Sequence, residues 1–315
     1  MPIEWTERIG RRVKLRDLHI LLAVAQSGSM GKAATELAVS QPAVWKAIAD
    51  LEGAVGVRLL ERSRQGVEPT THGRALLKCG VAVFDELRRG VKELEFLSDP
   101  TVGELRVGCT EPLAAGFVAT VISELSQKYP QATFQVVPGD RLTLLNRELR
   151  QRRIELAIIP TSGVDPTIDT DVEVLFDDRH IVMAGVQNKW VHRRNIALGD
   201  LIDEPWVLPP PDSLVGLSIA EAFRASGVEQ PCAHVVTFSI PLHCHLLATG
   251  RFLTMLPVSM AHLAKHLPLK SLSIKSPPHR RPIGVLTLKN RSLGPLARLF
   301  IDCAREFAKP LGKEH

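Results

Sequence analysis

Three stretches of helical periodicity fill residues 15–51, and they constrain the fold of this chain more than any other feature. Apolar residues recur at helical spacing from Leu15 to about Ala25, and Gly28 is a residue type that ends helices. Ser29 is placed to cap a second helix over Met30–Leu37, because a serine hydroxyl accepts a hydrogen bond from a backbone N–H of the first turn. The folded part of the chain is therefore predicted to begin with two short helices joined by a tight turn.

The third stretch completes a helix-turn-helix pattern. Ser40 can cap this helix, and Pro42 lies just inside it, where a missing N–H costs nothing. Val44, Ile48 and Leu51 follow at i, i+4 and i+7 and share one face, which can pack on the preceding helix. The other side of this helix carries Pro42, Trp45, Lys46 and Ala49.

A hairpin and a long helix follow this motif. Residues 59–69 lack helical periodicity, and Gly66 and Pro69 favour a hairpin, or wing. Thr70 can cap a helix from about Thr71 to Leu97. Its apolar residues alternate at spacings of three and four, which is typical of a short coiled-coil seam, and about three heptads suit a dimer arm better than an isolated helix. The seam residues are Leu77, Phe84, Leu87, Val91 and Leu94.

The pattern changes after Ser98–Thr101, which is the strongest domain boundary in the chain. The first elements beyond it are strands over 105–109, 133–137 and 156–159 and helices over 113–128 and 142–150. Such alternation implies a parallel sheet with right-handed crossovers. A second set spans 181–185, 206–208, 219–226, 234–236, 242–249 and 252–256, and a strand over 283–288 and a helix over 296–308 close the chain. Two α/β lobes of about 100 residues each are expected.

Composition sets outer limits on the class of protein. At 315 residues the chain is too long for one ordinary core, and 45% hydrophobic with 23% charged residues is typical of folded, soluble domains. A net charge of +5 favours, weakly, a polyanionic partner. The five cysteines are scattered, and neither a secretory leader nor an apolar run of about 18 residues is evident. We therefore expect reduced thiols and a cytoplasmic, nucleoid-associated protein without a membrane partner.

The start of the third helix is the candidate surface for reading double-stranded DNA. A recognition helix must keep its first turn and outer face polar so that it can enter the major groove. Gln41 and Lys46 suit base edges or phosphates, whereas Arg58, Arg62 and Arg64 beside the wing suit phosphates. From periodicity alone, an ordinary helical hairpin with a solvated charged face remains an alternative. The candidate DNA-binding residues are Ser29, Lys32, Ser40, Gln41, Pro42, Trp45, Lys46, Arg58, Arg62, Arg64 and Thr70.

A family resemblance supports the DNA-binding interpretation. The pattern consists of Leu18-His19, Ser29-Met30, Ala33-Ala34, Leu37, Ser40-Gln41-Pro42-Ala43-Val44, Ile48, Leu51-Glu52, Gly56, Leu59-Leu60-Glu61-Arg62 and Thr70-x-x-Gly73. Together these residues resemble the LysR-type transcriptional regulators without a gap over 15–77, and the chain from 104 onward resembles their periplasmic-binding-protein-like effector domain. The segment 67–70 further resembles the branch that controls aromatic-acid catabolism or sugar-binding-protein genes. The resemblance implies a homodimer or homotetramer that bends promoter DNA, responds to a small-molecule effector and acts on RNA polymerase.

The expected fold is an α+β multidomain chain, with a winged helix-turn-helix, a long linker helix and two α/β lobes. The predicted divisions are an arm over 1–14, the DNA-binding domain over 15–70, the linker helix over 71–97, a hinge over 98–103, lobe 1 over 104–176 and 284–310, and lobe 2 over 177–283.

Two residues depart from the family pattern. Trp45 stands where the family usually has a small serine, and Pro69 replaces a leucine before Thr70. The Trp45 indole either faces DNA, where it would cover a thymine methyl or a sugar edge, or turns inward and packs on the wing. We favour the outward orientation and leave both open to test.

The expected effector site lies between the two lobes, at the carboxyl ends of strands. Thr110 and Glu111 follow the first strand and open a helix, whose N-terminus favours an anion such as a small carboxylate. Thr110 is alternatively a plain helix cap, and Glu111 would repel a carboxylate unless Arg141 or Arg179 compensates. The candidate effector-binding residues are Thr110, Glu111, Asp140, Arg141, Thr161, Pro210, Asp212, Ser239 and Ile240.

Rival chemistry has little support in the sequence. No motif of a hydrolase, metalloprotease, phosphate loop or dinucleotide-binding site occurs, so no enzyme activity, catalytic residue or cofactor is expected. His262 and His266, and the run His243-Cys244-His245, are poor metal sites without a third ligand, so no metal is predicted. A carrier protein built on the same lobes, or a thiol-switch regulator using Cys232 and Cys244, remains an alternative.

Overall fold

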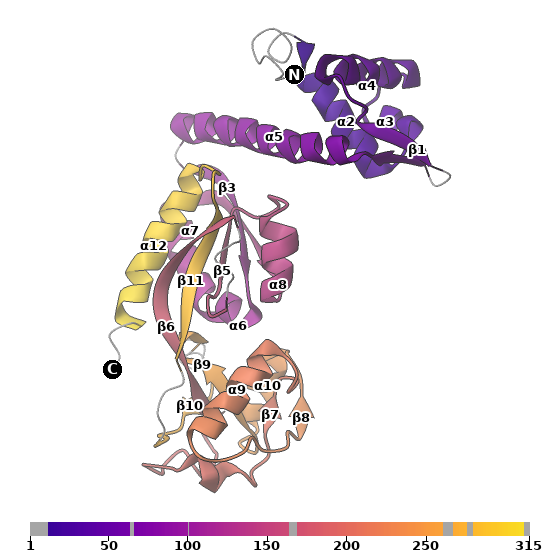
Figure 1. The fold of residues 1–315 in the computed structure, drawn as a ribbon. Helices are drawn as coiled ribbons and strands as arrows, with labels where there is room; N and C mark the ends of the chain where they lie inside the picture. Colours follow the sequence, from indigo (N-terminus) through magenta and orange to yellow (C-terminus); the bar gives the residue numbers. More distant parts are fainter. Residues whose placement is uncertain are drawn as a thin grey trace. The chain divides into compact units, whose positions relative to one another are not determined.

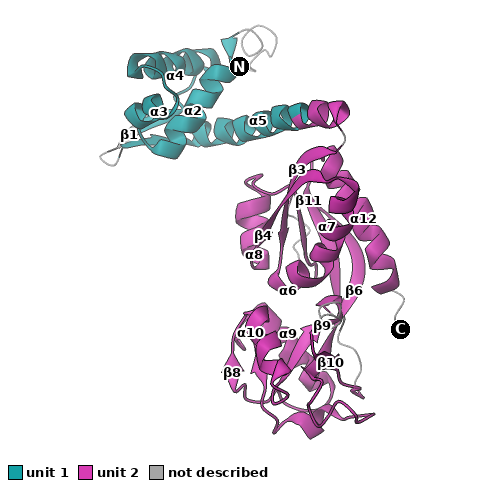
Figure 2. Ribbon diagram, turned by 180° about the vertical axis from the view of Figure 1, so that it is seen from behind, with its two compact units in different colours: residues 1–91 teal, residues 92–315 magenta. Residues whose placement is uncertain are grey.

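The computed structural model describes residues 12–63, 66–99, 101–163, 169–260, 267–275 and 280–311, with the backbone alone at residues 62, 63 and 280. The described chain contains both helices and strands (Figure 1). Contacts divide the chain into two compact units, residues 1–91 and residues 92–315 (Figure 2). No helix among the described residues has both the length and the apolar character needed to cross a membrane.

Three helices build the first unit: α2 (Leu15–Ser27), α3 (Met30–Glu36) and α4 (Gln41–Val55). Their ends confirm the caps read from the sequence. Gly28 ends α2 with a φ of 64°, a left-handed conformation that glycine adopts without strain. The Ser29 hydroxyl accepts from the Lys32 N–H at 3.5 Å, and the Ser40 hydroxyl accepts from the Ala43 N–H at 3.3 Å. Local capping chemistry therefore sets where α3 and α4 begin.

One small core holds these helices together. Val44 and Leu51 of α4 are fully buried against Leu21 and Val24 of α2 and Ala33 of α3. The predicted face of the third helix is therefore the packed one. Burial of about 1.5–3 kcal/mol per large aliphatic side chain is the main stabilising contribution for a unit of this size.

The predicted wing is an antiparallel hairpin of β1 (Leu60–Ser63) and β2 (Gly66–Pro69). The Val67 N–H donates to the Gly28 carbonyl at 2.9 Å, so the wing is tied to the turn between α2 and α3. The segment Leu59–Thr70 thus closes on the helical core and delivers the chain to the long helix.

The helix α5 (Thr71–Ser98) begins where Thr70 predicts. The Gly73 N–H donates to the Thr70 hydroxyl at 2.9 Å, which confirms Thr70 as the cap. The predicted seam, however, has two parts in this chain. Leu77 and Phe84 pack on the core of the first unit, whereas Leu87, Val91 and Leu94 are exposed. The first part is buried within the chain, and the second has an apolar face that the described chain leaves open to solvent.

The central sheet of the second unit has the strand order β10-β6-β11-β5-β3-β4, in which β10 spans Leu269–Ser271, and β9 (Leu253–Pro257) also pairs with β6. The strands β3 (Val102–Cys109), β4 (Gln131–Pro138) and β5 (Leu156–Pro160) are parallel, as the alternation predicts. The prediction of a parallel sheet is wrong for β11 (Arg280–Leu288), which pairs antiparallel with both β5 and β6 (Thr170–Gly185). The chain leaves lobe 1 along β6 and returns along β11, so the returning strand must run the opposite way.

Helices cover both faces of the lobe 1 sheet (Figure 1). Leu156 and Ile158 of β5 pack in one core, whereas the alternate residues Ala157 and Ile159 pack in the other. The predicted helix over 113–128 is formed by α6 (Glu111–Leu113), a π-helical segment η2 (Ala114–Val118) and α7 (Ala119–Lys128), and the helix over 142–150 by α8 (Arg141–Thr143) and η3 (Leu144–Leu149). The helix α12 (Pro295–Leu311) shares the core of α7.

Lobe 2 is built on the far half of β6, which pairs with β9 (Leu253–Pro257) and β10 (Leu269–Ser271). The sequence predicts the strand over 181–185, which is the last part of β6, but it does not predict the first half of β6. It does not predict β10 either, because three residues are too few to show a pattern. A small parallel pair, β7 (Val207–Leu208) and β8 (Val235–Val236), begins next to Trp206. The rings of Trp206 and Phe223 meet edge-on, with their centroids 5.4 Å apart. The remaining elements are η4 (Leu198–Leu201), α9 (Leu214–Ala225), α10 (Ile240–Ala248) and η5 (Val258–Met260).

Candidate functional site

The outer side of α4 is the first candidate surface. Gln41, Pro42 and Lys46 are exposed, while the intervening Val44 is fully buried. Trp45 is 37% exposed, so its indole is partly covered and yet reaches the surface of the first unit. The exposed Gln41 and Lys46 provide the polar groups that a helix needs to read base edges in the major groove.

The other predicted DNA contacts surround this surface in the first unit. Ser40 and Lys32 are exposed, Ser29 is half-buried at the start of α3, and Arg58 is exposed before the wing. Arg64 lies outside the described residues, as does the side chain of Arg62. Their proposed phosphate contacts therefore remain predictions.

Thr70 makes two structural hydrogen bonds, and the sequence predicts only the one that caps α5. Its hydroxyl donates to the Arg58 carbonyl at 2.8 Å while accepting from the first turn of α5. The side chain therefore joins the start of the wing to the long helix. Its hydroxyl hydrogen is already donated to a carbonyl within the protein.

Two side chains that the sequence reasoning did not select hold this corner of the first unit. The Glu52 carboxylate accepts from the Leu59 N–H at 2.6 Å, which fixes the end of α4 to the start of the wing. The exposed Arg74 guanidinium donates to the Pro69 carbonyl at 2.7 Å and adds a cation beside the wing. The charge of Arg74, four residues beyond Thr70, was the available signal for a further phosphate contact.

The second candidate site lies at the carboxyl edge of the parallel strands of lobe 1. Thr110 follows β3, Asp140 and Arg141 follow β4, and Thr161 follows β5, so the sheet brings these four residues to one edge. Thr110 stands at the N-cap position of α6, and its hydroxyl makes no hydrogen bond to the first turn of that helix. Glu111 is exposed in that turn.

Hydrogen bonds hold this edge in one conformation. Asp140 caps α8 by accepting from the Thr143 N–H at 3.0 Å, and the hydrogen bonds from Thr143 lower the pKa of that carboxyl. Arg141 donates to the Ser162 carbonyl, and the Thr161 N–H donates to the Pro282 carbonyl at 2.8 Å. The loops after β4 and β5 are thereby tied to each other and to β11.

The predicted residues of lobe 2 follow its parallel pair in the same way. The Pro210 carbonyl, after β7, accepts from the Ser213 hydroxyl at 2.6 Å, and Asp212 in the same turn is exposed. Ser239, after β8, caps α10 by accepting from the Leu242 N–H at 3.4 Å. The Ile240 side chain is buried in the lobe 2 core, which leaves its backbone N–H as the group it can offer a ligand.

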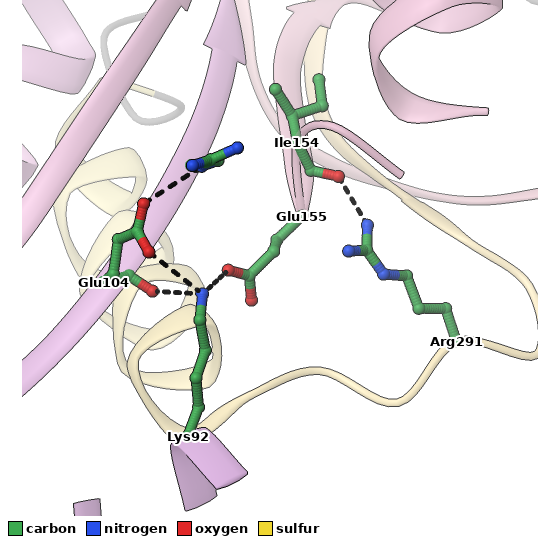
Figure 3. A network of polar contacts seen from close by, with 6 residues as sticks. Lys92, Glu104, Ile154, Glu155 and Arg291 are labelled. Carbon is green, nitrogen blue, oxygen red and sulfur yellow. Dashed lines mark hydrogen bonds and ion pairs between the residues drawn. The ribbon is translucent and has the colours of Figure 1, made fainter. Parts of the chain in front are cut away.

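A cationic network fixes the last turns of α5 to lobe 1 (Figure 3). The Lys92 ammonium lies 3.1 Å from the Glu155 carboxylate and donates to the Glu104 carbonyl at 3.1 Å. Arg291 donates to the carbonyl of Ile154, the residue that precedes Glu155. Lys92 therefore joins the end of α5 to two segments that are far apart in the sequence, at Glu104 and at Glu155.

The thiols and histidines give little support to the rival chemistry. Burial raises the pKa of Cys244, the opposite of what an activated thiolate needs. The ring of His243 lies within hydrogen-bond distance of Thr254 and Thr237. His262 and His266 lie outside the described residues, and the described parts of the chain hold no cluster of three metal-ligating side chains.

Family models match both parts of the chain. The model described as "Bacterial regulatory helix-turn-helix protein, lysR family" matches residues 15–74, and the LysR substrate binding domain matches residues 98–309. The regulator GbpR of Azospirillum brasilense is 28% identical over 96% of this chain and 89% of its own length. The uncharacterised regulator YdcI of Escherichia coli K12 is 26% identical over 96% of this chain and 99% of its own.

Solved structures share the fold along nearly the whole chain. A full-length variant of OxyR from Pseudomonas aeruginosa has a TM-score of 0.67 at 20% identity, over 96% of this chain and 99% of that one. Full-length CbnR, solved in complex with its target DNA, has a TM-score of 0.55 at 22% identity, over 94% of this chain and all of that one. The helix-turn-helix, the two α/β lobes and the two family matches together show that this chain belongs to the LysR family of helix-turn-helix transcriptional regulators.

Proposed function

We propose that this regulator binds promoter DNA through α4 and the wing, and that a small-molecule effector held between its two lobes alters that binding. The observation that carries the proposal is the pairing of an outward polar α4 with two α/β lobes whose candidate residues follow the carboxyl ends of parallel strands. Such an edge offers backbone N–H groups and side chains to a ligand without disturbing the core.

The division of labour on DNA follows from the side chains. Gln41 and Lys46 in the first turns of α4 contact base edges, Trp45 covers an apolar base or sugar edge, and the arginines beside the wing contact phosphates. Contacts of the first kind select the sequence, whereas phosphate contacts add affinity without selecting it.

Assembly extends this contact to a long operator. The exposed apolar face of α5 pairs two chains, and two such dimers form a tetramer that presents four winged helices to bent DNA. Effector-driven movement of the lobes then changes the bend and the recruitment of RNA polymerase. Full-length CbnR, which has the same fold, is a precedent for the binding of target DNA alone.

A mobility-shift titration of the full-length protein against the divergent promoter beside its own gene tests the DNA half of this proposal. We expect saturable binding that weakens steeply as salt rises, because each phosphate contact displaces condensed counterions. Lys46→Gln should weaken binding, whereas Lys309→Gln on α12 should not. Absence of binding at moderate salt, or binding with no salt dependence, would contradict the proposal.

A melting screen tests the effector half. Aromatic acids, sugar acids and amino acids are added to the full-length protein, and a compound that binds the folded state raises the melting temperature. The compound should then alter the DNase footprint and the bend angle on the promoter. An effector that binds and leaves both unchanged would contradict the coupling.

A further inference from the structure

One guanidinium lies where the two crossing strands leave lobe 1. Arg281 is the second residue of β11, and it stands opposite Asp178 of β6 in the antiparallel register. The next residue, Pro282, accepts hydrogen bonds from the Thr161 N–H at 2.8 Å and from the Thr161 hydroxyl at 3.2 Å. Arg281 is therefore adjacent in the chain to the edge that carries the candidate effector residues, although no sequence pattern connects it to that edge.

The carboxylate opposite Arg281 in the register accepts hydrogen bonds from another residue. Asp178 is buried, and its two oxygens accept from the Ser259 N–H at 3.1 Å and from the Ser259 hydroxyl at 2.6 Å. Among the residues that the structure describes, the Arg281 guanidinium makes neither a direct ion pair nor a side-chain hydrogen bond. A half-buried cation with five donors and no acceptor is costly, because its partial desolvation is not repaid by hydrogen bonds.

A second guanidinium is held at the loop that follows β5. Arg141 is held at the start of α8 by its hydrogen bond to the Ser162 carbonyl, next to Thr161. The pKa of Arg281 is lowered chiefly by burial, with Asp178 and Glu221 opposing the shift and the positive charge of Arg141 adding to it. Two like charges near each other in a partly desolvated site are unfavourable unless an anion lies between them.

We propose that Arg281 and Arg141 together bind a carboxylate group of the effector, so that the effector of this regulator is a carboxylic acid. The inference rests on the proposed function, since it assigns the chemistry of the same site. A carboxylate has two coplanar oxygens that match the paired donors of a guanidinium. The arginine pair fits that role better than the start of α6, which is three residues long and carries the exposed Glu111.

The test uses the full-length protein and a fixed set of probes. Benzoate, succinate and citrate are titrated by calorimetry at constant ionic strength, with sodium chloride as the reference salt and benzamide and succinamide as neutral analogues. We expect saturable binding of at least one acid, and at least a tenfold loss of its affinity in Arg281→Gln and in Arg141→Gln. Arg281→Lys keeps the positive charge but loses the paired donors of the guanidinium, so its affinity for the acid should lie between those of the parent and Arg281→Gln. Arg150→Gln, an exposed arginine on the same lobe, should match the parent.

The outcomes separate this inference from the proposed function. Failure of all three acids to bind better than chloride, or binding of an acid that Arg281→Gln and Arg141→Gln leave unchanged, overturns the arginine site. If a neutral compound instead changes promoter binding equally in the parent and in both variants, the regulator stands and this inference falls. Loss of promoter binding by the parent itself contradicts the proposed function. Circular dichroism of each variant checks that it is folded. If Arg281→Gln unfolds, Arg141→Gln still tests the site, because Arg141 is the more exposed of the two residues.

Discussion

At the scale of single residues, Gly73 shows how little room the corner between wing and linker helix leaves. A Cβ added there would lie 2.0 Å from the Leu59 carbonyl oxygen, far inside contact distance, and backbone cannot move aside cheaply. We expect Gly73→Ala to lower the free energy of unfolding of the first unit by about 2 kcal/mol or more. Gly53 of α4 meets nothing within 4 Å, so Gly53→Ala should instead raise it by about 0.5–1 kcal/mol. Urea unfolding of both variants measures the contrast, and equal effects would contradict it.

Trp45 is the residue whose replacement is most informative about DNA reading. Because the indole is partly exposed on the outer side of α4, Trp45→Ser should change operator preference while lowering the free energy of unfolding by only about 1 kcal/mol. Selection from randomised operators, with urea unfolding alongside, measures both quantities. Gln26→Ser, exposed on α2 and not on the outer side of α4, is the control and should leave operator preference unchanged. If Trp45→Ser leaves operator preference unchanged and lowers the free energy of unfolding by more than about 3 kcal/mol, the result would favour the inward orientation of the indole.

His243 makes lobe 2 sensitive to acid. Its ring nitrogens lie 2.9 Å from the Thr254 hydroxyl and 3.1 Å from the Thr237 carbonyl, and burial lowers its pKa below the ordinary 6.5. The unfolded chain therefore takes up this proton first as the pH falls, so the free energy of unfolding should decrease below about pH 6.5. In His243→Gln that part of the decrease should disappear, whereas the exposed His245→Gln should keep it. Urea unfolding at about pH 7.5 and about pH 5.5 compares the three chains.

At the scale of elements, local chemistry explains which boundaries could be predicted. Ser29, Ser40 and Thr70 mark helix starts because a cap is decided by a few neighbouring residues. The first half of β6 escaped prediction because exposed Asp171 and Asp177 sit in it, and only pairing with β11 makes it a strand. Such pairing joins segments about a hundred residues apart, which no local pattern reveals.

The same limit applies to the candidate site. Thr110, Asp140 and Thr161 could be selected because each follows a recognisable strand. Arg281 could not, because its position beside that edge depends on the antiparallel return of β11. Residues placed by the order of strands in the sheet are found only when the sheet itself is known.

The end of α5 offers a test of how firmly an element is attached. Lys92 is partly buried between Glu104 and Glu155, so Lys92→Gln would leave a carboxylate without its cation. We expect the free energy of unfolding of the second unit to fall by about 1–3 kcal/mol. Lys128→Gln, which removes an exposed pair within α7, should change it by less than about 0.5 kcal/mol. Similar effects of the two variants would show that the network holds nothing together.

At the scale of the whole molecule, the exposed part of the α5 seam predicts how chains associate. Leu94 is 66% exposed in the single chain, and a charge buried in a coiled-coil interface is costly. Leu94→Glu should weaken the dimer at least about tenfold, a loss of about 1.4 kcal/mol, while the unfolding of each unit stays near the parent. Sedimentation velocity over a concentration series measures this. Lys78→Glu, on the opposite side of the same helix, should leave the dimer intact.

The return of β11 into the middle of the lobe 1 sheet has a consequence for synthesis. The strand lies between β6 and β5, yet it begins at Arg280 and is synthesised after every other strand that the structure describes. The elements of lobe 2 are complete before it, so lobe 2 can fold while the sheet of lobe 1 still lacks a central strand. A chain cut short before β11 would therefore expose the edges of two strands, and the nascent protein must pass through that same vulnerable stage each time it is made.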